Sequence, residues 1–236
     1  PKDLSFLDGK VIAKCLCLTF YENKKIFYKI SKKLNCDLSN VKVLLIRNEP
    51  PFNQQYINST FILEHIDKKV KIINHPKSIR EVPEKLFSIR LFKFMPPTLI
   101  SQNLDEIKKF FKKNKKIIVK PINGYSGNEV VLLRKFNSKI VNKYLKKYNH
   151  TMFQKFLPKI SNGDKRVFII NGKIKGSITR VPKKRSILSN MSKGAIAKKS
   201  KLTKKEIKIS LQVANLLKQN NIYFAGIDFI QEKLIG

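Results

Sequence analysis

Lys120 ends a run of hydrophobic β-formers and precedes a turn of small residues. The stretch reads IIVKPINGYSGNEVV over residues 117–131. An ammonium group at the end of an apolar strand is costly to bury unless an opposite charge meets it. Gly124 and Gly127 allow such a turn to aim main-chain N–H groups at a bound anion. These residues form a candidate phosphate cradle; the alternative is an ordinary hairpin turn that follows a lysine.

Two arginines and one aspartate on later predicted strands could also meet an anion or a metal. Arg166 begins the strand RVFIING, and Arg180 lies near the end of KIKGSITRVP. On one face of a hairpin they could clamp phosphate or carboxylate oxygens; the alternative is two exposed sheet arginines. Asp228 lies between hydrophobic residues in GIDFI, so its carboxylate needs a cation or several donors. A Mg²⁺ ion suits a phosphate site, and a salt bridge to a lysine is the alternative.

Histidine and cysteine chemistry is weakly represented. The three histidines lie far apart without metal-ligand spacing, and no P-loop, Cys-His or Ser-His-Asp pattern occurs. On a strand, Cys15 and Cys17 would share one face and could not bridge each other. Three cysteines suit a reducing cytoplasm better than a disulfide framework.

The hydrophobic periodicity predicts an α+β chain in two parts with a boundary near residue 80. Helices and strands are expected to alternate early, and antiparallel hairpins to dominate later. Helices are predicted in YINSTFILEHI, in NLDEIKKFFKK and from residue 203 to about 219. Strands are predicted at 41–47, 71–76, 96–101, 117–120, 129–134, 152–160, 166–172, 173–182 and 222–230.

Helix starts and helix faces can be assigned to particular residues. Asn103 and Thr203 are predicted N-caps, each followed three positions later by a glutamate that can reach back to the cap. The predicted apolar faces are Ile57, Phe61, Ile62 and Ile66 in the first helix; Leu104, Ile107 and Phe111 in the second; and Ile207, Leu211, Ala214 and Leu217 in the third.

Positive charge dominates the composition. Fifty Lys and Arg residues against 16 Asp and Glu residues give a formal net charge of +34. Nucleic-acid binding is one interpretation. A surface of solvated lysines is favoured, because the lysines are scattered in pairs along the chain and no RNA-recognition, zinc-finger or KH signature occurs. The charge would still attract anionic ligands. No apolar run is long enough for a membrane helix.

Several stretches together resemble the bacterial glutathione synthetases of the ATP-grasp superfamily. RNEPPFNQQYINSTFILE resembles that family's R-x-D-P-P-F-x-x-x-F-I-x-A-T-x-I-L-E, and IINHPKSIREVPEKLF its V-N-x-P-x-S-L-R-x-x-N-E-K-L-F. IIVKPINGYSGNEVV, FLPKISNGDKRVFIINGKI and GIDFI follow in the family's order. Five ordered matches with near-constant spacing are far more specific than any one motif.

The resemblance implies a fold and a domain plan. Two α+β subdomains of an ATP-grasp fold would clasp ATP, after a partial α/β N-terminal substrate domain. The N-terminal domain would span residues 1–80 and the ATP-grasp domain residues 81–236. The first subdomain, with the glycine loop, would end at 153, and the second would begin at 154.

The resemblance also implies an activity. ATP would phosphorylate the cysteinyl carboxylate of γ-glutamylcysteine, and the glycine amine would attack the acyl phosphate to give glutathione. Mg²⁺, or Mn²⁺ in its place, would accompany ATP, and the reaction would take place in the cytoplasm. The formation of a homo-oligomer is left open by the resemblance. Two rival hypotheses are another ATP-grasp carboxylate–amine ligase and a basic nucleic-acid-binding protein without catalysis.

Site residues carry over by matching position. Their implied roles divide into nucleotide, acyl-phosphate, substrate and metal contacts. The nucleotide phosphates would be surrounded by Lys85, Lys120, Gly124, Ser126 and Gly127, the adenine would be lined by Gln154, Lys155, Phe156 and Leu157, and the ribose would be approached by Asp164. The acyl phosphate and the substrate carboxylate would be held by Arg166 and Arg180. Substrate would also contact Arg47 and Asn190, and the metal would be bound by Asp228.

The chain departs from the family pattern in two respects. In the family pattern, the acidic residue of an acidic-x-Asn pair that binds metal is expected at or just after Gly236. The family's first strand–helix unit would come before residue 1. Leu188 and Ile196 stand where the family's flexible loop has arginines, whereas Asn190 and Gly194 match it. Because Mg²⁺ held by one carboxylate cannot bridge two phosphates reliably, we expect residues 1–236 alone to be a weak catalyst or inactive. The flexible loop shields the acyl phosphate from water, so its changed chemistry also lowers the expected efficiency.

Overall fold

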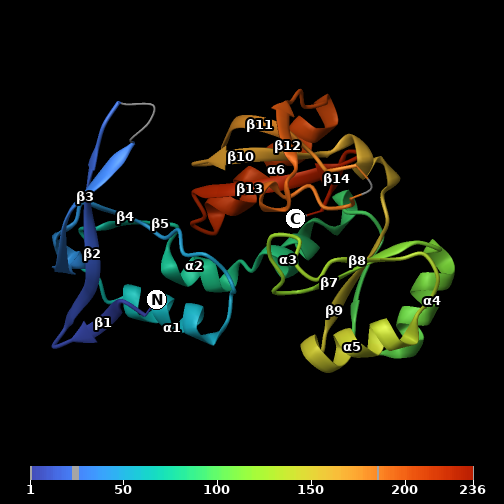
Figure 1. The fold of residues 1–236 in the computed structure, drawn as a ribbon, viewed down its shortest axis with the longest axis horizontal. Coiled ribbons are helices and arrows are strands. Elements are labelled where there is room, and N and C mark those ends of the chain that lie inside the picture. The colour runs from blue at the N-terminus through green and yellow to red at the C-terminus, as the bar shows by residue number, and fades with distance from the viewer. Residues whose placement is uncertain (1, 23–26, 185, 236) are drawn as a thin grey trace. The chain divides into compact units, whose positions relative to one another are not determined.

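A computed structural model describes residues 2–22, 27–184 and 186–235. The chain divides into two compact units, Pro1–Glu81 and Val82–Gly236. Figure 1 shows the mixed helices and strands of each unit. Within the described residues, no helix combines the length and apolar character needed to cross a membrane.

The first unit begins with an antiparallel meander. It contains β1 (Leu4–Leu7), β2 (Lys10–Phe20) and β3 (Tyr28–Asp37), paired in that order. The expected early alternation of helix and strand is therefore wrong for the first 40 residues. Alternation begins only afterwards, where β4 (Val43–Leu45) pairs in parallel with β5 (Lys71–Ile73) across α1 (Gln54–Leu63), and α2 (Pro76–Glu81) follows.

The α1 helix is confirmed, but one residue of its predicted apolar face is not in the core. Leu63 and Ile66 are buried, whereas the Phe61 ring is half exposed. The guanidinium carbon of Arg80 lies 3.8 Å from the Phe61 ring centroid, a cation–π contact that links α2 to α1. The aromatic ring is used for this contact instead of core packing.

The second unit contains a four-stranded sheet with both of its helices on one face. The strand order is β6 (Thr98–Ser101), β9 (Thr151–Lys155), β7 (Ile117–Pro121) and β8 (Val131–Leu133). Ile117 and Val119 share a core with α4 (Leu104–Asn114) and α5 (Ser138–Tyr148). Because strand side chains alternate between faces, Lys120 emerges on the face opposite α4 and α5.

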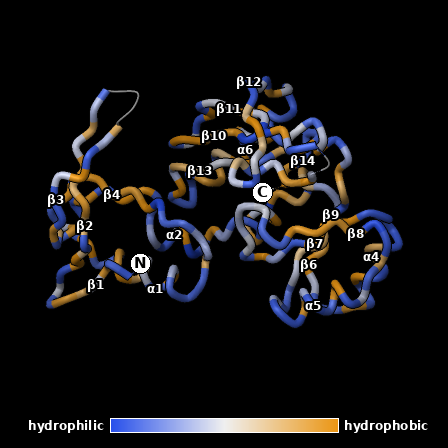
Figure 2. Tube along the Cα trace, in the orientation of Figure 1, coloured by the Kyte–Doolittle hydropathy of each residue, from blue (hydrophilic) through white to orange (hydrophobic). Residues whose placement is uncertain are grey.

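Helix α5 was not among the predicted elements, although its sequence is amphipathic. The Asn137 side chain caps it by accepting from the Ile140 N–H, and Val141 and Tyr144 are buried. In Figure 2, hydrophobic and hydrophilic residues alternate along α5, whereas hydrophobic residues run on along neighbouring strands. This helix turns out to be important for the loop between β7 and β8.

A five-stranded sheet completes the second unit. Its order is β12 (Ile196–Lys199), β11 (Lys173–Val181), β10 (Asp164–Ile170), β13 (Phe224–Ile230) and β14 (Lys233–Leu234). Helix α6 (Lys204–Gln219) covers one face, where Val167 and Phe229 join the core. The other face carries the alternate residues of β10 and β13, which include Asp164, Arg166 and Asp228.

Two details of the predicted helices need correction. On α6, Ile207 and Leu211 are exposed, because Glu206, Ile209, Ser210, Val213, Ala214 and Leu217 form the buried face. The rotation of α6 about its axis is set by the contact between Glu206 and Lys165. The buried Glu206 carboxylate accepts a hydrogen bond from Lys165 and also completes the predicted capping box with Thr203. On α4, Asn103 is the N-cap as predicted, but Glu106 accepts from the Ser101 hydroxyl instead of the cap N–H.

Candidate functional site

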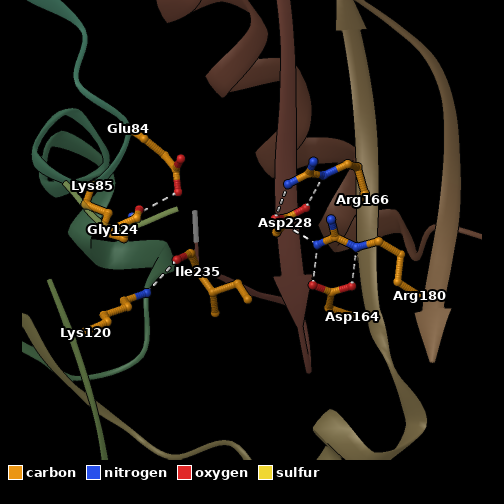
Figure 3. A network of polar contacts seen from close by, with 9 residues as sticks. All are labelled: Glu84, Lys85, Lys120, Gly124, Asp164, Arg166, Arg180, Asp228 and Ile235. Atoms are coloured by element: carbon orange, nitrogen blue, oxygen red, sulfur yellow. Dashed lines mark hydrogen bonds and ion pairs between the residues drawn. The ribbon is translucent and has the colours of Figure 1, made fainter. Parts of the chain in front are cut away.

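Lys120 is buried on the face of the four-stranded sheet opposite α4 and α5. Its side chain is 9% exposed, and its Nζ donates to the Ile235 carbonyl oxygen at 3.0 Å (Figure 3). Burial, and then the charge of Lys85, lowers the Lys120 pKa from 10.5 to about 8, although Glu84 and Asp228 oppose this shift. An anion placed here would favour the charged form of the lysine and raise its pKa.

Lys85 projects from the short helix α3 (Glu84–Phe87) toward the same region. Its Nζ donates to the Gly124 carbonyl oxygen at 2.5 Å and lies 3.4 Å from the Glu84 carboxylate. Lys85 is 8% exposed, whereas the side chain of Glu84 is 65% exposed. A largely solvated carboxylate screens a buried ammonium weakly, so this lysine also favours an anionic ligand.

The glycine loop between β7 and β8 contacts a second loop. Ser126 and Gly127 adopt left-handed backbone conformations, with φ of 50° and 70°. A Cβ on Gly127 would lie 2.5 Å from Asn190 Oδ1 and 3.2 Å from Leu188 Cδ2. Gly127 is therefore required both by its backbone and by the close approach of residues 188–190. The fold thus brings together the glycine loop and the loop at residues 188–190, both of which the sequence marks as candidate site segments.

The second group of charges lies on the helix-free face of the five-stranded sheet. Arg166 faces Asp228 across β10 and β13, and Asp164 faces Arg180 across β10 and β11. Arg166 Nε and Nη2 donate to Asp228 Oδ1 and Oδ2 at 2.8 and 2.6 Å. Arg180 Nε and Nη2 donate to Asp164 Oδ1 and Oδ2 at 2.8 and 2.5 Å. Both pairs are bidentate.

A diagonal contact joins the two pairs into the Arg–Asp cluster, defined as Asp164, Arg166, Arg180 and Asp228. Arg180 Nη2 lies 2.9 Å from Asp228 Oδ2, as Figure 3 shows. The hydrogen bond from Arg166 to Asp228 raises the pKa of this arginine despite its burial. Two guanidinium groups and two carboxylates sum to zero charge. The predicted anion clamp is thus already occupied by internal carboxylates.

Burial differs between the two ends of the Arg–Asp cluster. The side chains of Arg180 and Asp164 are 5% and 3% exposed, whereas that of Arg166 is 36% exposed. Burial raises the pKa of Asp164, and hydrogen bonds from Arg180 and the Ser189 side chain oppose this rise. Arg166 is therefore the arginine that an incoming ligand can reach with the smaller change in structure.

The predicted adenine strand is part of β9 and the residues after it. The Gln154 side chain is buried and donates to the Thr98 hydroxyl at 2.9 Å, whereas Lys155 is exposed. The Phe156 N–H donates to the Lys116 carbonyl oxygen, and Leu157 accepts from Ile160. The adenine contacts of residues 154–157 stay a prediction.

Arg47 belongs to the first unit, after β4. Its charge lowers the pKa of Tyr56, although burial raises that pKa more strongly. Arg47 therefore lies near Tyr56 within this unit. Its contact with substrate stays a prediction.

The charged groups do not form a metal site within the described residues. Among residues 2–22, 27–184 and 186–235, no group of three or more His, Cys, Asp or Glu residues is placed to hold a metal ion. Both oxygens of Asp228 accept from guanidinium groups. Asp228 is therefore held by guanidinium groups in this structure, and its role as a metal ligand stays a prediction.

Two contributors to the site were missed by sequence reasoning. The side chain of Ser189, which lies in the loop that approaches Gly127, forms a hydrogen bond with Asp164. Glu129, at the end of the glycine loop, bonds to α5 through its carbonyl and its carboxylate. No local pattern marks either residue, because each partner is distant in sequence.

Comparisons with known proteins agree over both units. Residues 1–80 match the family described as prokaryotic glutathione synthetase, N-terminal domain, and residues 84–236 match the ATP-grasp domain of the same enzyme. A glutathione synthetase of Bradyrhizobium diazoefficiens is 34% identical over 99% of this chain and 76% of that protein. One from Buchnera aphidicola is 36% identical over 99% and 74%, respectively.

Solved structures match the fold at lower identity. The D-cycloserine synthetase DcsG aligns with a TM-score of 0.62 and 11% identity, over 85% of this chain and 75% of that one. A RiPP-associated ATP-grasp ligase from Chryseobacterium gregarium aligns with a TM-score of 0.60 and 17% identity, over 98% and 74%. Fold and sequence agree, and the chain belongs to the prokaryotic glutathione synthetase family of ATP-grasp ligases.

Proposed function

We propose that this chain binds ATP with its phosphates at Lys85 and Lys120 and joins γ-glutamylcysteine to glycine. The observation that carries this proposal is a pair of buried ammonium groups that donate to neutral main-chain carbonyls. A carbonyl oxygen satisfies one hydrogen bond but supplies no net charge. Phosphate oxygens would replace the carbonyls and neutralise the lysines, which makes nucleotide binding favourable at this place.

In the first half of the reaction, the cysteinyl carboxylate of γ-glutamylcysteine attacks the γ-phosphorus of ATP. The bond to the bridging oxygen breaks, and ADP leaves with the electron pair. Lys85 and Lys120 would hold the phosphates and stabilise the charge that develops on them. Gly124, Ser126 and Gly127 would cover the phosphates from the glycine loop, through main-chain N–H groups.

In the second half, the glycine amine attacks the acyl carbon, phosphate leaves and the amine nitrogen loses a proton. Arg166 and Arg180 would hold the acyl phosphate and the substrate carboxylate. Because both arginines are paired with aspartates, the ligand must exchange places with a carboxylate instead of entering an open clamp. Arg166 is the more exposed of the two and would exchange first.

The divalent ion expected for an ATP-grasp ligase would be Mg²⁺, or Mn²⁺ in its place. It would neutralise charge on the nucleotide phosphates. Asp228 would supply one oxygen ligand once Arg166 turns to the acyl phosphate. A structural relative, the ATP-grasp ligase PsnB, forms a complex with Mg and ADP, and its TM-score to this chain is 0.55 at 13% identity.

The remaining assignments follow from this placement of the nucleotide. Residues 81–153 and 154–236 would clasp ATP, with residues 154–157 beside adenine and Asp164 toward the ribose. Arg47 and Asn190 would contact substrate, and homo-oligomer formation stays a prediction. A cytoplasmic location stays an expectation, because a chain with three cysteines suits a reducing compartment.

Nucleotide binding and turnover can be tested separately. Titration with a fluorescent ADP analogue should give saturable binding that unlabelled ATP displaces. Turnover in a coupled ADP-release assay, which we expect to be weak for residues 1–236 alone, should then require both γ-glutamylcysteine and glycine. Release with glutamate or alanine in place of glycine would favour a different ATP-grasp ligase, and the absence of nucleotide binding would refute the proposal.

A further inference from the structure

The glycine loop is attached to the protein at both of its ends, but by different kinds of contact. At its start, the Gly124 carbonyl accepts from Lys85 at 2.5 Å. At its end, the Glu129 carbonyl accepts from the Tyr144 hydroxyl of α5 at 2.7 Å. The first partner is a lysine assigned to the nucleotide phosphates, whereas Tyr144 is a buried core residue.

The Glu129 side chain adds to the attachment at α5. Its Oε1 accepts from Lys147 Nζ at 2.6 Å, and its Oε2 accepts from the Tyr148 hydroxyl. Lys147 also lies over the Tyr148 ring, 5.1 Å from the centroid. Three residues on one face of α5, Tyr144, Lys147 and Tyr148, therefore hold Glu129 in place.

The backbone of Glu129 requires this support. Its φ is 56°, in the left-handed region that a residue with a side chain rarely adopts. Such a conformation persists only where neighbouring contacts favour it. Since Glu129 directly precedes the short connection to β8, its backbone sets the direction in which residues 124–128 leave the sheet.

We propose that Tyr144 and Glu129 form a loop clamp, the fixed end about which the glycine loop moves when nucleotide binds. Phosphate takes over Lys85 and releases Gly124, while the contacts of Tyr144, Lys147 and Tyr148 with Glu129 persist. Tyr144 and Glu129 are thus positioning residues, which act on the nucleotide through the loop. This inference rests on the proposed function, since it takes nucleotide phosphates as the ligand of Lys85.

A structural alternative is that these contacts only attach α5 to the sheet. The two interpretations differ in what changes when the clamp is weakened. A helix attachment would alter global stability alone. A loop clamp would alter the exchange of amide hydrogens in residues 122–130 and the affinity for nucleotide, with α5 still folded.

The experiment compares Tyr144→Phe and Glu129→Gln with the wild-type chain and with Asp105→Asn. The control breaks the exposed ion pair between Asp105 and Lys108 on α4, away from the loop. Hydrogen exchange is followed by mass spectrometry with and without ADP, together with the Kd for ADP and the KM for ATP. Circular dichroism verifies folding, and Glu129→Gln, at a half-exposed residue, remains informative if Tyr144→Phe unfolds.

We expect Tyr144→Phe to speed exchange in residues 122–130 and to raise the Kd for ADP by about tenfold, the effect of one hydrogen bond. The KM for ATP should rise in parallel, with a smaller change in kcat, and Asp105→Asn should match the wild type. Unchanged loop exchange and Kd in both clamp variants would overturn the clamp while leaving the proposed function standing. Failure of the wild type to bind ADP would instead overturn the proposed function, and the clamp's role in nucleotide binding with it.

Discussion

The two buried groups of cations in the second unit solve the same electrostatic problem differently. Lys85 and Lys120 donate to main-chain carbonyl oxygens, and their nearest carboxylate, Glu84, is largely exposed. Arg166 and Arg180 are instead paired with two aspartates in a neutral cluster. The lysine pair therefore retains a net positive charge that an anion can neutralise, whereas the arginines can bind an anion only by exchange.

This difference assigns the two groups different roles in binding. A buried charge without a counter-charge destabilises the free protein and is stabilised by the ligand. A buried ion pair holds the fold together as long as both partners are present. We therefore expect substitutions at the lysines to affect mainly ligand affinity and those in the Arg–Asp cluster to affect mainly stability.

The largest effect is expected for Asp164→Asn. This change leaves buried Arg180 without its bidentate partner, and losing one member of a buried pair costs about 3–5 kcal/mol in the free energy of unfolding. Urea denaturation followed by circular dichroism measures the loss. The exposed Asp105→Asn control should change stability by less than about 0.5 kcal/mol. A loss below about 1 kcal/mol at position 164 would contradict the distinction between the two groups.

Lys120→Met should have the opposite effect on stability. The Lys120 pKa falls from 10.5 to about 8 on folding, so keeping this charge buried at pH 7 costs at most on the order of 3 kcal/mol, and methionine removes that cost. The same variant should bind ADP about 10–100-fold more weakly, as expected for loss of one charge-assisted hydrogen bond. Thermal unfolding and ADP titration measure both effects, with exposed Lys116→Met as the control. Destabilisation together with unchanged affinity would refute a phosphate role for Lys120.

The affinity for ADP should depend on pH through Lys120. Bound phosphate favours the protonated lysine, so the Kd should be constant below about pH 8 and rise by up to tenfold per pH unit above it. The unfolded chain binds more protons than the folded one between about pH 8 and 10.5, so this group's contribution to stability rises with pH across that window. Calorimetric titrations in the wild type and in Lys120→Met test this. An identical pH dependence in the two proteins would exclude Lys120 as the titrating group.

The smallest effect is expected for Arg166→Lys. Lysine keeps the charge but replaces the bidentate contact with Asp228 by a single bond. Because the Arg166 side chain is 36% exposed, we expect a loss of only about 1 kcal/mol in the free energy of unfolding. A loss as large as that of Asp164→Asn would show that the exposed end of the Arg–Asp cluster is as tightly coupled as the buried end.

Much of the second unit could be predicted from local patterns. Apart from α5, most strands and turns from Ile117 onward follow local patterns, and the Thr203 capping box marks the start of α6. The opening meander was missed because β2 and β3 are largely exposed and lack a clear apolar alternation. The exposed positions of Ile207 and Leu211 could not be predicted either, since the Glu206–Lys165 contact fixes the rotation of α6.

The amino-acid sequence by itself determined the family and most elements of the second unit, because these depend on local patterns and their spacing. The tertiary structure decided which charges are neutralised. Arg166 and Arg180 look like open anion ligands in the sequence, yet strand register places Asp228 and Asp164 directly opposite them. The attachment of Glu129 to Tyr144 was likewise decided by packing. Pairing across strands and between a loop and a helix depends on contacts between residues distant along the chain, and no local pattern encodes them.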